Sequence, residues 1–334
     1  MSARRGMVAA LVLVVVLGAL AAGATNLARY TLDVGTTLLV LIAVAQAWNL
    51  LAGFSRQFSL GVSAFVGTGA YAATLVMIHL GSGPLTAVLC GAVASAVLAV
   101  CLSPALLRLR GDYLTIGTLA AALAVQAWAV NASSVGGSSG LNVPLEVIPD
   151  NVTLFRLAVL VVLACSLATL WFMSSSVGLR MSAVGQDPDA AVTLGVNVWR
   201  LRLLALVVSS ALTGAAGSVV ALQQVHVEPI GTLGLTWTID AILMTVVGGA
   251  GTLVGPALGA VIIHLGLTRQ LGENPVLGLV LEGLLLILVI RFVPRGIWPT
   301  VRDGVVRLVR RPPPPPPPAE VEPVPVEPRR ERVS

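Results

Sequence analysis

The sequence predicts an all-α fold, a polytopic transmembrane helical bundle of about 8–10 spans. Two features of the composition indicate this class: 56% of the 334 residues are hydrophobic and only 10% are charged. An average soluble domain carries about 25% charged residues, and a soluble chain of this length needs polar surface to cover its core. The third observation is that apolar runs of about 20 residues, long enough to cross a bilayer, recur along the chain.

Nine apolar runs are the candidate spans, and short polar connections separate most of them. The runs lie near residues 7–24, 33–52, 61–80, 85–107, 113–131, 153–173, 201–222, 238–268 and 276–293. The first run follows Arg4 and Arg5, and residues 1–32 are predicted to be a retained membrane anchor helix. A cleaved signal peptide is the alternative, because small residues end this run. Residues 33–297 then form the main transmembrane domain.

The positions of the Arg residues predict the orientation. The connections that carry Arg lie near 56, 108–110 and 180–202, and those without Lys or Arg lie at 81–84, 132–150 and 223–237. Positive residues concentrate in cytoplasmic loops. The chain is therefore predicted to cross the cell (inner) membrane with its N-terminus in the cytoplasm. The net charge of +5 follows from this placement and does not indicate nucleic-acid binding.

The C-terminal stretch is also rich in Arg and is predicted to be cytoplasmic. Nine continuous spans would leave it outside, so one run is expected to break. The best candidate is the run at 238–268, because its centre near 248–256 is rich in Gly and ends in Pro, and both residues break helices. Two short spans meeting there give an even number of crossings, about ten, which keeps both ends of the chain in the cytoplasm. A re-entrant hairpin with eight spans does so equally well. Residues 298–334, with unbroken proline at 312–318, are predicted to be a disordered tail.

The cytoplasmic connection at about 174–202 contains helix signals of its own. Asp187 followed by Pro188 is typical of a helix start, an N-cap acceptor with proline in the first turn. Asp189 adds negative charge where the helix dipole is positive, and Gly195 is the predicted C-cap. Such an ordered loop favours a docking site for a partner, and an ordinary connection between spans is the alternative.

Four motifs in order resemble the LivM-type branch of the branched-chain amino acid, urea and amide permease family, over roughly residues 35–297. Asp189-Ala190-Ala191, with Gly195 four residues after Ala191, resembles the E-A-A-x-x-x-G signature of permease subunits in ATP-binding-cassette importers, with Asp for Glu. The segment 49–61 resembles N-L-x-x-G-x-x-G-x-x-S-L-G, although Arg56 or its neighbour replaces a small residue. The others are R-G-D-Y-L-T-I at 110–116 and G-G-A-G-T-L-V-G-P at 248–256, followed by F-V-P-R-G at 292–296.

The resemblance implies the permease subunit of an ATP-driven importer, for branched-chain amino acids first and urea or amides as alternatives. It implies four kinds of partner: membrane lipid, a second related permease, two cytoplasmic ATPase subunits and an extracytoplasmic solute-binding protein. The chain contains no G-x-x-x-x-G-K-[ST] loop, so the ATPases are expected to bind the ATP and no cofactor is expected here. The residues expected to couple to the ATPases are Asp187, Asp189, Ala190, Ala191 and Gly195.

A substrate pathway is expected where small and polar residues interrupt the helices, because irregular backbone in a membrane must be buried or line a wet cavity. The candidate residues are Asn49, Ser59, Gly61, Ser63, Gly248, Gly249, Gly251 and Gly255. Tight helix packing explains the same glycines without a substrate. Similar small-residue segments at 61–70 and 209–217 indicate a possible internal inverted repeat.

The rival hypothesis is a stand-alone secondary transporter or channel for a small neutral solute. The apolar runs contain few ionisable residues, His264 and Glu282 among them, whereas a proton relay would need several that can pair. No catalytic set and no metal-ligand spacing stand out, so we expect neither an enzyme nor a metal site.

Overall fold

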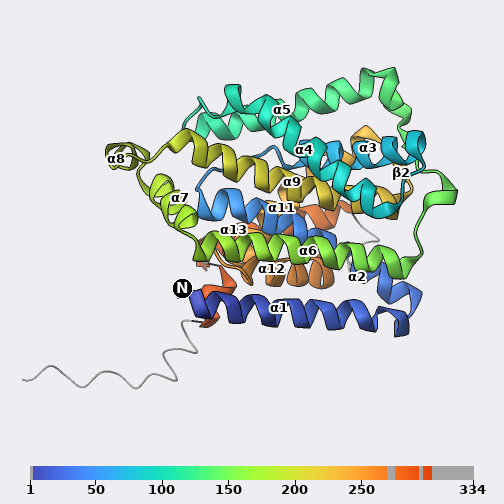
Figure 1. Cartoon of the computed structure of the whole chain (residues 1–334), viewed down its shortest axis with the longest axis horizontal. Coiled ribbons are helices and arrows are strands. Elements are labelled where there is room, and N and C mark those ends of the chain that lie inside the picture. Colours follow the sequence, from blue (N-terminus) through green and yellow to red (C-terminus); the bar gives the residue numbers. More distant parts are fainter. Residues whose placement is uncertain (1–2, 269–274, 293–295, 303–334) are drawn as a thin grey trace, which may run out of the picture.

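The computed structural model describes residues 3–268, 275–292 and 296–302, and nearly all of this part is helical (Figure 1). The α-helices are α1 (Ala3–Gly23), α2 (Arg29–Asn49), α3 (Val62–Leu80), α4 (Pro84–Leu106), α5 (Asp112–Asn131), α6 (Asn151–Ser174), α7 (Ser176–Gln186), α8 (Pro188–Thr193), α9 (Val198–Gln224), α10 (Pro229–Thr232), α11 (Thr236–Gly248), α12 (Gly255–Ile263) and α13 (Pro275–Phe292). The strands β1 (Leu141–Asn142) and β2 (His226–Val227) pair antiparallel. The predicted all-α class is confirmed.

Seven helices in the described residues are long and apolar enough to cross a membrane, and six of them coincide with predicted runs. They are Arg29–Phe54, Val62–Leu80, Pro84–Leu106, Asp112–Asn131, Asn151–Ser174, Val198–Gln224 and Pro229–Gly248. Two shorter apolar helices, Ala10–Asn26 and Gly255–Gly266, correspond to the first run and to the second half of the run at 238–268. The chain is therefore a multi-pass membrane protein.

The predicted break in the run at 238–268 is present as a pair of half-helices. α11 has 13 residues and α12 has 9, about 20 and 14 Å at 1.5 Å per residue, so each alone is shorter than a bilayer core of about 30 Å. Only together with α10 does α11 form the 20-residue candidate span Pro229–Gly248. A Cβ atom on Gly259 would collide with the Met244 carbonyl, and one on Gly248 would collide with the carbonyl of Gly255. These contacts make the two helices antiparallel, so the glycine-rich turn closes a hairpin.

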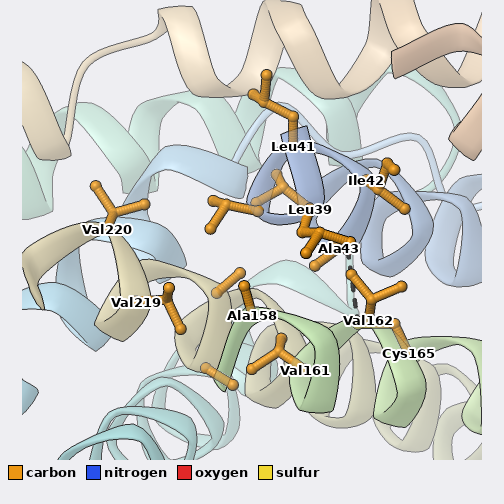
Figure 2. Close-up of a cluster of buried hydrophobic side chains, with 14 of the residues drawn as sticks. Leu39, Leu41, Ile42, Ala43, Ala158, Val161, Val162, Cys165, Val219 and Val220 are labelled. Carbon is orange, nitrogen blue, oxygen red and sulfur yellow. Dashed lines mark hydrogen bonds between the residues drawn. The ribbon is translucent and has the colours of Figure 1, made fainter. Parts of the chain in front are cut away.

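The core lies where α2 packs against α6 and α9. Figure 2 shows side chains from these three helices meeting, among them Ala43, Val162 and Val219. Ala43, Val162 and Val219 are each at most 4% exposed. A hydrogen bond between polar side chains also joins α6 to α2: Ser166 Oγ donates to Gln46 Oε1 at 2.9 Å. Burial of α2 on all sides makes it the central helix of the bundle.

Glycine lets α3, α4 and α9 approach one another closely. A Cβ atom on Gly69 of α3 or Gly217 of α9 would collide with the backbone of the other helix, and one on Gly91 of α4 would collide with Ser218. Ser218 Oγ donates to the Gly69 carbonyl at 3.2 Å. The predicted small-residue faces at 61–70 and 209–217 therefore pack against each other. The internal repeat stays a prediction.

The bundle has two distinct ends, which Figure 1 shows on the left and right. α7, α8 and the start of α1 lie at one end, called the α8 end below, and β2 lies at the other, the β2 end. At the β2 end, the pairing of β1 with β2 joins the loop after α5 to the loop after α9. Val143 N also donates to the Val225 carbonyl at 2.8 Å. Of the predicted tail, residues 298–302 are helical and the remainder lies outside the described residues, so its boundary stays a prediction.

Candidate functional site

The start of α8 is fixed by the side chain of Asp187. Its Oδ1 accepts hydrogen bonds from the backbone N–H groups of Asp189 and Ala190, both at 3.0 Å. Pro188 is the first helical residue, where a missing N–H costs nothing. The N-cap predicted at Asp187 is therefore confirmed. A second cap follows at α9, where Asn197 Oδ1 accepts from Arg200 N at 3.0 Å.

The end of α8 is a Schellman turn centred on Gly195. Val196 N donates to the Ala191 carbonyl at 3.1 Å, and Gly195 N donates to the Val192 carbonyl at 2.9 Å. This pattern requires a left-handed residue after the last turn, and Gly195 has φ +76°. A Cβ atom on Gly195 would meet nothing within 4 Å, so its conformation and not its surroundings favours glycine. The C-cap predicted there is confirmed.

α8 presents most of its surface to solvent. Ala191 is 2% exposed and faces the bundle, whereas Ala190 lies on the exposed side. Val192 is 58% exposed and Leu194 80%. A six-residue helix held by caps at both ends, with apolar side chains left uncovered, has the form of a docking element.

Two contacts join this segment to the rest of the α8 end. Arg110 Nη1, in the turn between α4 and α5, lies 3.5 Å from Asp189 Oδ1. Gly185, at the end of α7, packs so closely on the loop after α2 that a Cβ atom there would lie 3.1 Å from Arg56 Cγ and 3.2 Å from the Ser55 carbonyl carbon. Movement of α8 would therefore reach both α5 and the loop after α2.

A cavity of about 460 Å³ opens beside these contacts. Its lining comes from the loop after α2, the turn before α5, the first turns of α5 and the start of α9. The lining residues are Arg56, Gln57, Phe58, Leu109, Gly111, Asp112, Leu114, Thr115, Ile116 and Arg202. A smaller space of about 10 Å³ shares Gln57 and Leu114 with this wall and reaches Ser59 and Thr118.

The predicted pathway residues fall into two groups, and the first surrounds the turn of the half-helix hairpin. The buried Asn49 side chain donates through Nδ2 to the Thr252 carbonyl at 2.8 Å and accepts from Gly251 N at 2.7 Å. Gly248 touches the backbone of Gly255, and Gly249 touches the backbone of Gly296. The Asn49 bonds hold the hairpin against the end of α2, and the Gly248–Gly255 contact packs its two halves together. A part in a pathway stays a prediction for this group.

The second group is Ser59 and Gly61, on the irregular segment before α3, together with Ser63 in the first turn of α3. The Ser59 carbonyl accepts from Trp48 Nε1 at 2.9 Å, and Ser63 N donates to Thr238 Oγ1 at 3.1 Å. Leu60 N donates to Thr118 Oγ1 at 2.9 Å, which joins this segment to α5. Ser63 Oγ is buried without a hydrogen-bond partner in the described part of the chain. This group therefore lies next to the cavity wall.

Sequence reasoning missed two features of the site. It treated Arg56 and Arg202 as topology signals, although both line the cavity. It did not separate α7 from the loop, although Ser175 begins that helix by accepting from Gly178 N at 3.2 Å. A serine three residues before the bonded N–H is a recognisable start signal. Within the described residues, no three His, Cys, Asp or Glu side chains are grouped as metal ligands.

Comparison with known proteins gives one family and several relatives. The family model described as "Branched-chain amino acid transport system / permease component" matches residues 30–290. The high-affinity branched-chain amino acid transport system permease protein LivM of Salmonella typhimurium is 26% identical over 306 residues, 82% of this chain and 71% of that protein, and its Escherichia coli counterpart matches equally. The fructose import permease protein FrcC of Rhizobium meliloti is 32% identical over 147 residues, 41% of this chain and 39% of its own length. No solved structure matches.

Proposed function

This chain belongs to the branched-chain amino acid transport system permease components, and we propose that it is one of two permeases in an ATP-driven importer of branched-chain amino acids. The family consists of transport components and not of enzymes. In this proposal the chain supplies half of the membrane pathway, two cytoplasmic ATPases supply the energy, and an extracytoplasmic protein delivers the substrate.

The observation that carries the proposal is the capped helix α8. The residues that fix it, Asp187 and Gly195, frame the acidic-Ala-Ala segment that resembles the coupling signature, and its apolar side chains Val192 and Leu194 are exposed. An exposed apolar element at the end of a membrane bundle favours contact with a protein partner. We infer that the α8 end faces the cytoplasm, because the Arg-rich connections also lie there.

The bundle also has room for a second permease. Only 28% of the apolar window of α4 and 22% of that of α5 is buried, whereas the figure for the central helix α2 is 78%. Lipid can cover part of these faces, and a second related permease can cover the rest. Because α5 is loosely packed and is joined to α8 through Arg110, we propose that it moves when the ATPases close, which alternates access to the pathway.

The relatives that cover most of the chain support one class of substrate. The two LivM proteins, which span 82% of it, are named for branched-chain amino acids, whereas the sugar permeases match over shorter stretches. We therefore propose leucine, isoleucine and valine as substrates.

Cross-linking tests the docking part of the proposal. A Leu194→Cys variant, in a chain whose three native cysteines are changed to Ser, is combined with the proposed ATPase subunits carrying single cysteines. We expect a disulfide between α8 and an ATPase. The control variant Ser138→Cys lies at the β2 end and should give none. Equal cross-linking from both positions would contradict the proposal.

A further inference from the structure

The backbone of Arg56 has a conformation that favours glycine. Its φ is +50°, one of two positive values at residues other than glycine in the described residues. A side chain makes this conformation costly, and such strained residues concentrate at functional sites. In the motif at 49–61, counting from Asn49 places Arg56 at the second glycine of the N-L-x-x-G-x-x-G pattern. This chain therefore has a guanidinium where glycine would relieve the strain.

The strained residue lines the cavity at the α8 end together with a second arginine. Arg202, near the start of α9, also lines the cavity, and its Nε is buried without a hydrogen-bond partner in the part of the chain that the structure describes. Buried N–H donors are almost always paired, so an unpaired one needs an explanation. Two guanidiniums in one cavity lining, one with a spare donor, fit a carboxylate, which arginine binds with matched geometry.

The remaining lining adds a negative charge and an apolar surface. Asp112 supplies a carboxylate, and the apolar part comes from Phe58, Leu109, Leu114 and Ile116. A volume of about 460 Å³ lies within the 300–1,000 Å³ typical of small-molecule sites. A molecule with a carboxylate, an ammonium group and a short aliphatic side chain has a partner for each of its parts in this lining.

We propose that the cavity at the α8 end binds an aliphatic amino acid, with Arg56 and Arg202 for its carboxylate and Asp112 for its ammonium group. The assignment rests on the proposed function, because that function makes the α8 end the side of release. Gly185 packs on Arg56, and Gly111 of the lining follows Arg110, the partner of Asp189. The site thus contacts the α7–α8 segment directly, and the coupling movement would change its walls.

Equilibrium binding of radiolabelled L-leucine to the full chain in phosphatidylcholine nanodiscs tests this site. We expect saturable binding that Arg56→Gly weakens about 10- to 100-fold, the range for a lost hydrogen bond to a charged group. Arg56→Lys keeps the charge and should lose less. Arg202→Gln should weaken binding as Arg56→Gly does. The matched control is Arg108→Gln, an exposed arginine at the same end that does not line the cavity, and its affinity should stay within about twofold of the original.

Glycine suits the backbone of residue 56, so Arg56→Gly should fold and melt no lower than the original chain, which separates lost binding from lost structure. No saturable leucine binding, or equal binding by Arg56→Gly, would overturn the site. Anionic phosphatidylglycerol is the rival occupant. If it abolishes leucine binding in the nanodiscs and Arg56→Gly removes that competition, the cavity is a lipid phosphate site and the inference is wrong. ATP-driven uptake by the assembled importer, measured separately, reports on the proposed function whatever the binding result.

Discussion

Arg110 Nη1 lies 3.5 Å from Asp189 Oδ1, which joins the turn before α5 to the first turn of α8. The side chains are 74% and 79% exposed, so the pair contributes about 0–1 kcal/mol to stability. Its importance is therefore its position, because it connects α8, the proposed docking element, to the loosely packed transmembrane helix α5. Asp189 is also the acidic residue of the segment that resembles the coupling signature.

Replacing Asp189 with Asn tests this connection. Loss of a charge-assisted contact to the ATPase costs about 1.5–3 kcal/mol, so we expect ATP-driven uptake to fall about 10-fold or more. Because the intramolecular pair is exposed, the melting temperature should change by no more than about 2 °C. Glu146→Gln makes the same chemical change on an exposed loop outside the α8 end and should leave uptake unchanged. Normal uptake by the Asp189 variant would refute a coupling role for this carboxylate.

Gly195→Trp tests the docking surface through the backbone. The left-handed conformation of Gly195, with φ +76°, costs a residue with a side chain about 1–2 kcal/mol, and the bulky ring would occupy the open space around the cap. We expect normal membrane insertion together with ATP hydrolysis that no longer drives uptake. Gly81, with φ +56° and equally open space, ends α3, and Gly81→Trp is the matched control. Transport by the Gly195 variant at the original rate would show that α8 does not dock.

Asn49→Ala should destabilise the protein and not alter substrate preference. The change leaves the Gly251 N–H and the Thr252 carbonyl without their buried partner, which costs about 1–3 kcal/mol for each unsatisfied group. We expect a melting temperature lower by several degrees and a reduced yield of folded protein. Asn131→Ala removes an exposed bond within one helix and should have little effect. A stable Asn49→Ala protein with altered substrate selectivity would instead place Asn49 in the pathway.

Membrane topology gives a prediction for the two ends of the bundle. We expect Gln186→Cys, in α7, to react with an impermeant thiol reagent only in inside-out vesicles, and Ser138→Cys only in right-side-out vesicles. A reporter that is active only outside the membrane, fused after Val309, should give no signal. A strong signal from that fusion would place the C-terminal stretch outside the membrane, which requires an odd number of crossings. The break in the run at 238–268 would then not give the even number that we predict.

Local signals in the sequence predicted the local structure well. Asp187, Pro188 and Gly195 act through bonds within a few residues, so their types and spacing were enough to place α8. The break between α11 and α12 followed in the same way from Gly and Pro. The sequence left open whether the two halves are short spans or a re-entrant hairpin, and the close contact of Gly248 with Gly255 and Gly259 shows that they run antiparallel, which fits both.

Contacts between distant residues could not be predicted from the sequence. The bonds from Asn49 to Gly251 and Thr252 join positions about 200 residues apart, and no periodicity encodes them. Arg56 and Arg202, about 146 residues apart in the sequence, likewise line one cavity without any local signal that predicts it. The motif at 49–61 did show that a small residue was missing, but only the positive φ of Arg56 reveals that the replacement is strained.

The central claim is that this chain moves substrate only when separate ATPases drive it, and uptake of labelled leucine into proteoliposomes tests that claim most directly. The chain reconstituted with a second permease, the ATPases and the binding protein should accumulate leucine when ATP is present on the α8 side, and should not do so without ATP. The chain alone should accumulate none, with or without a proton or sodium gradient. Gradient-driven accumulation by the chain alone would contradict the account and establish a stand-alone secondary transporter.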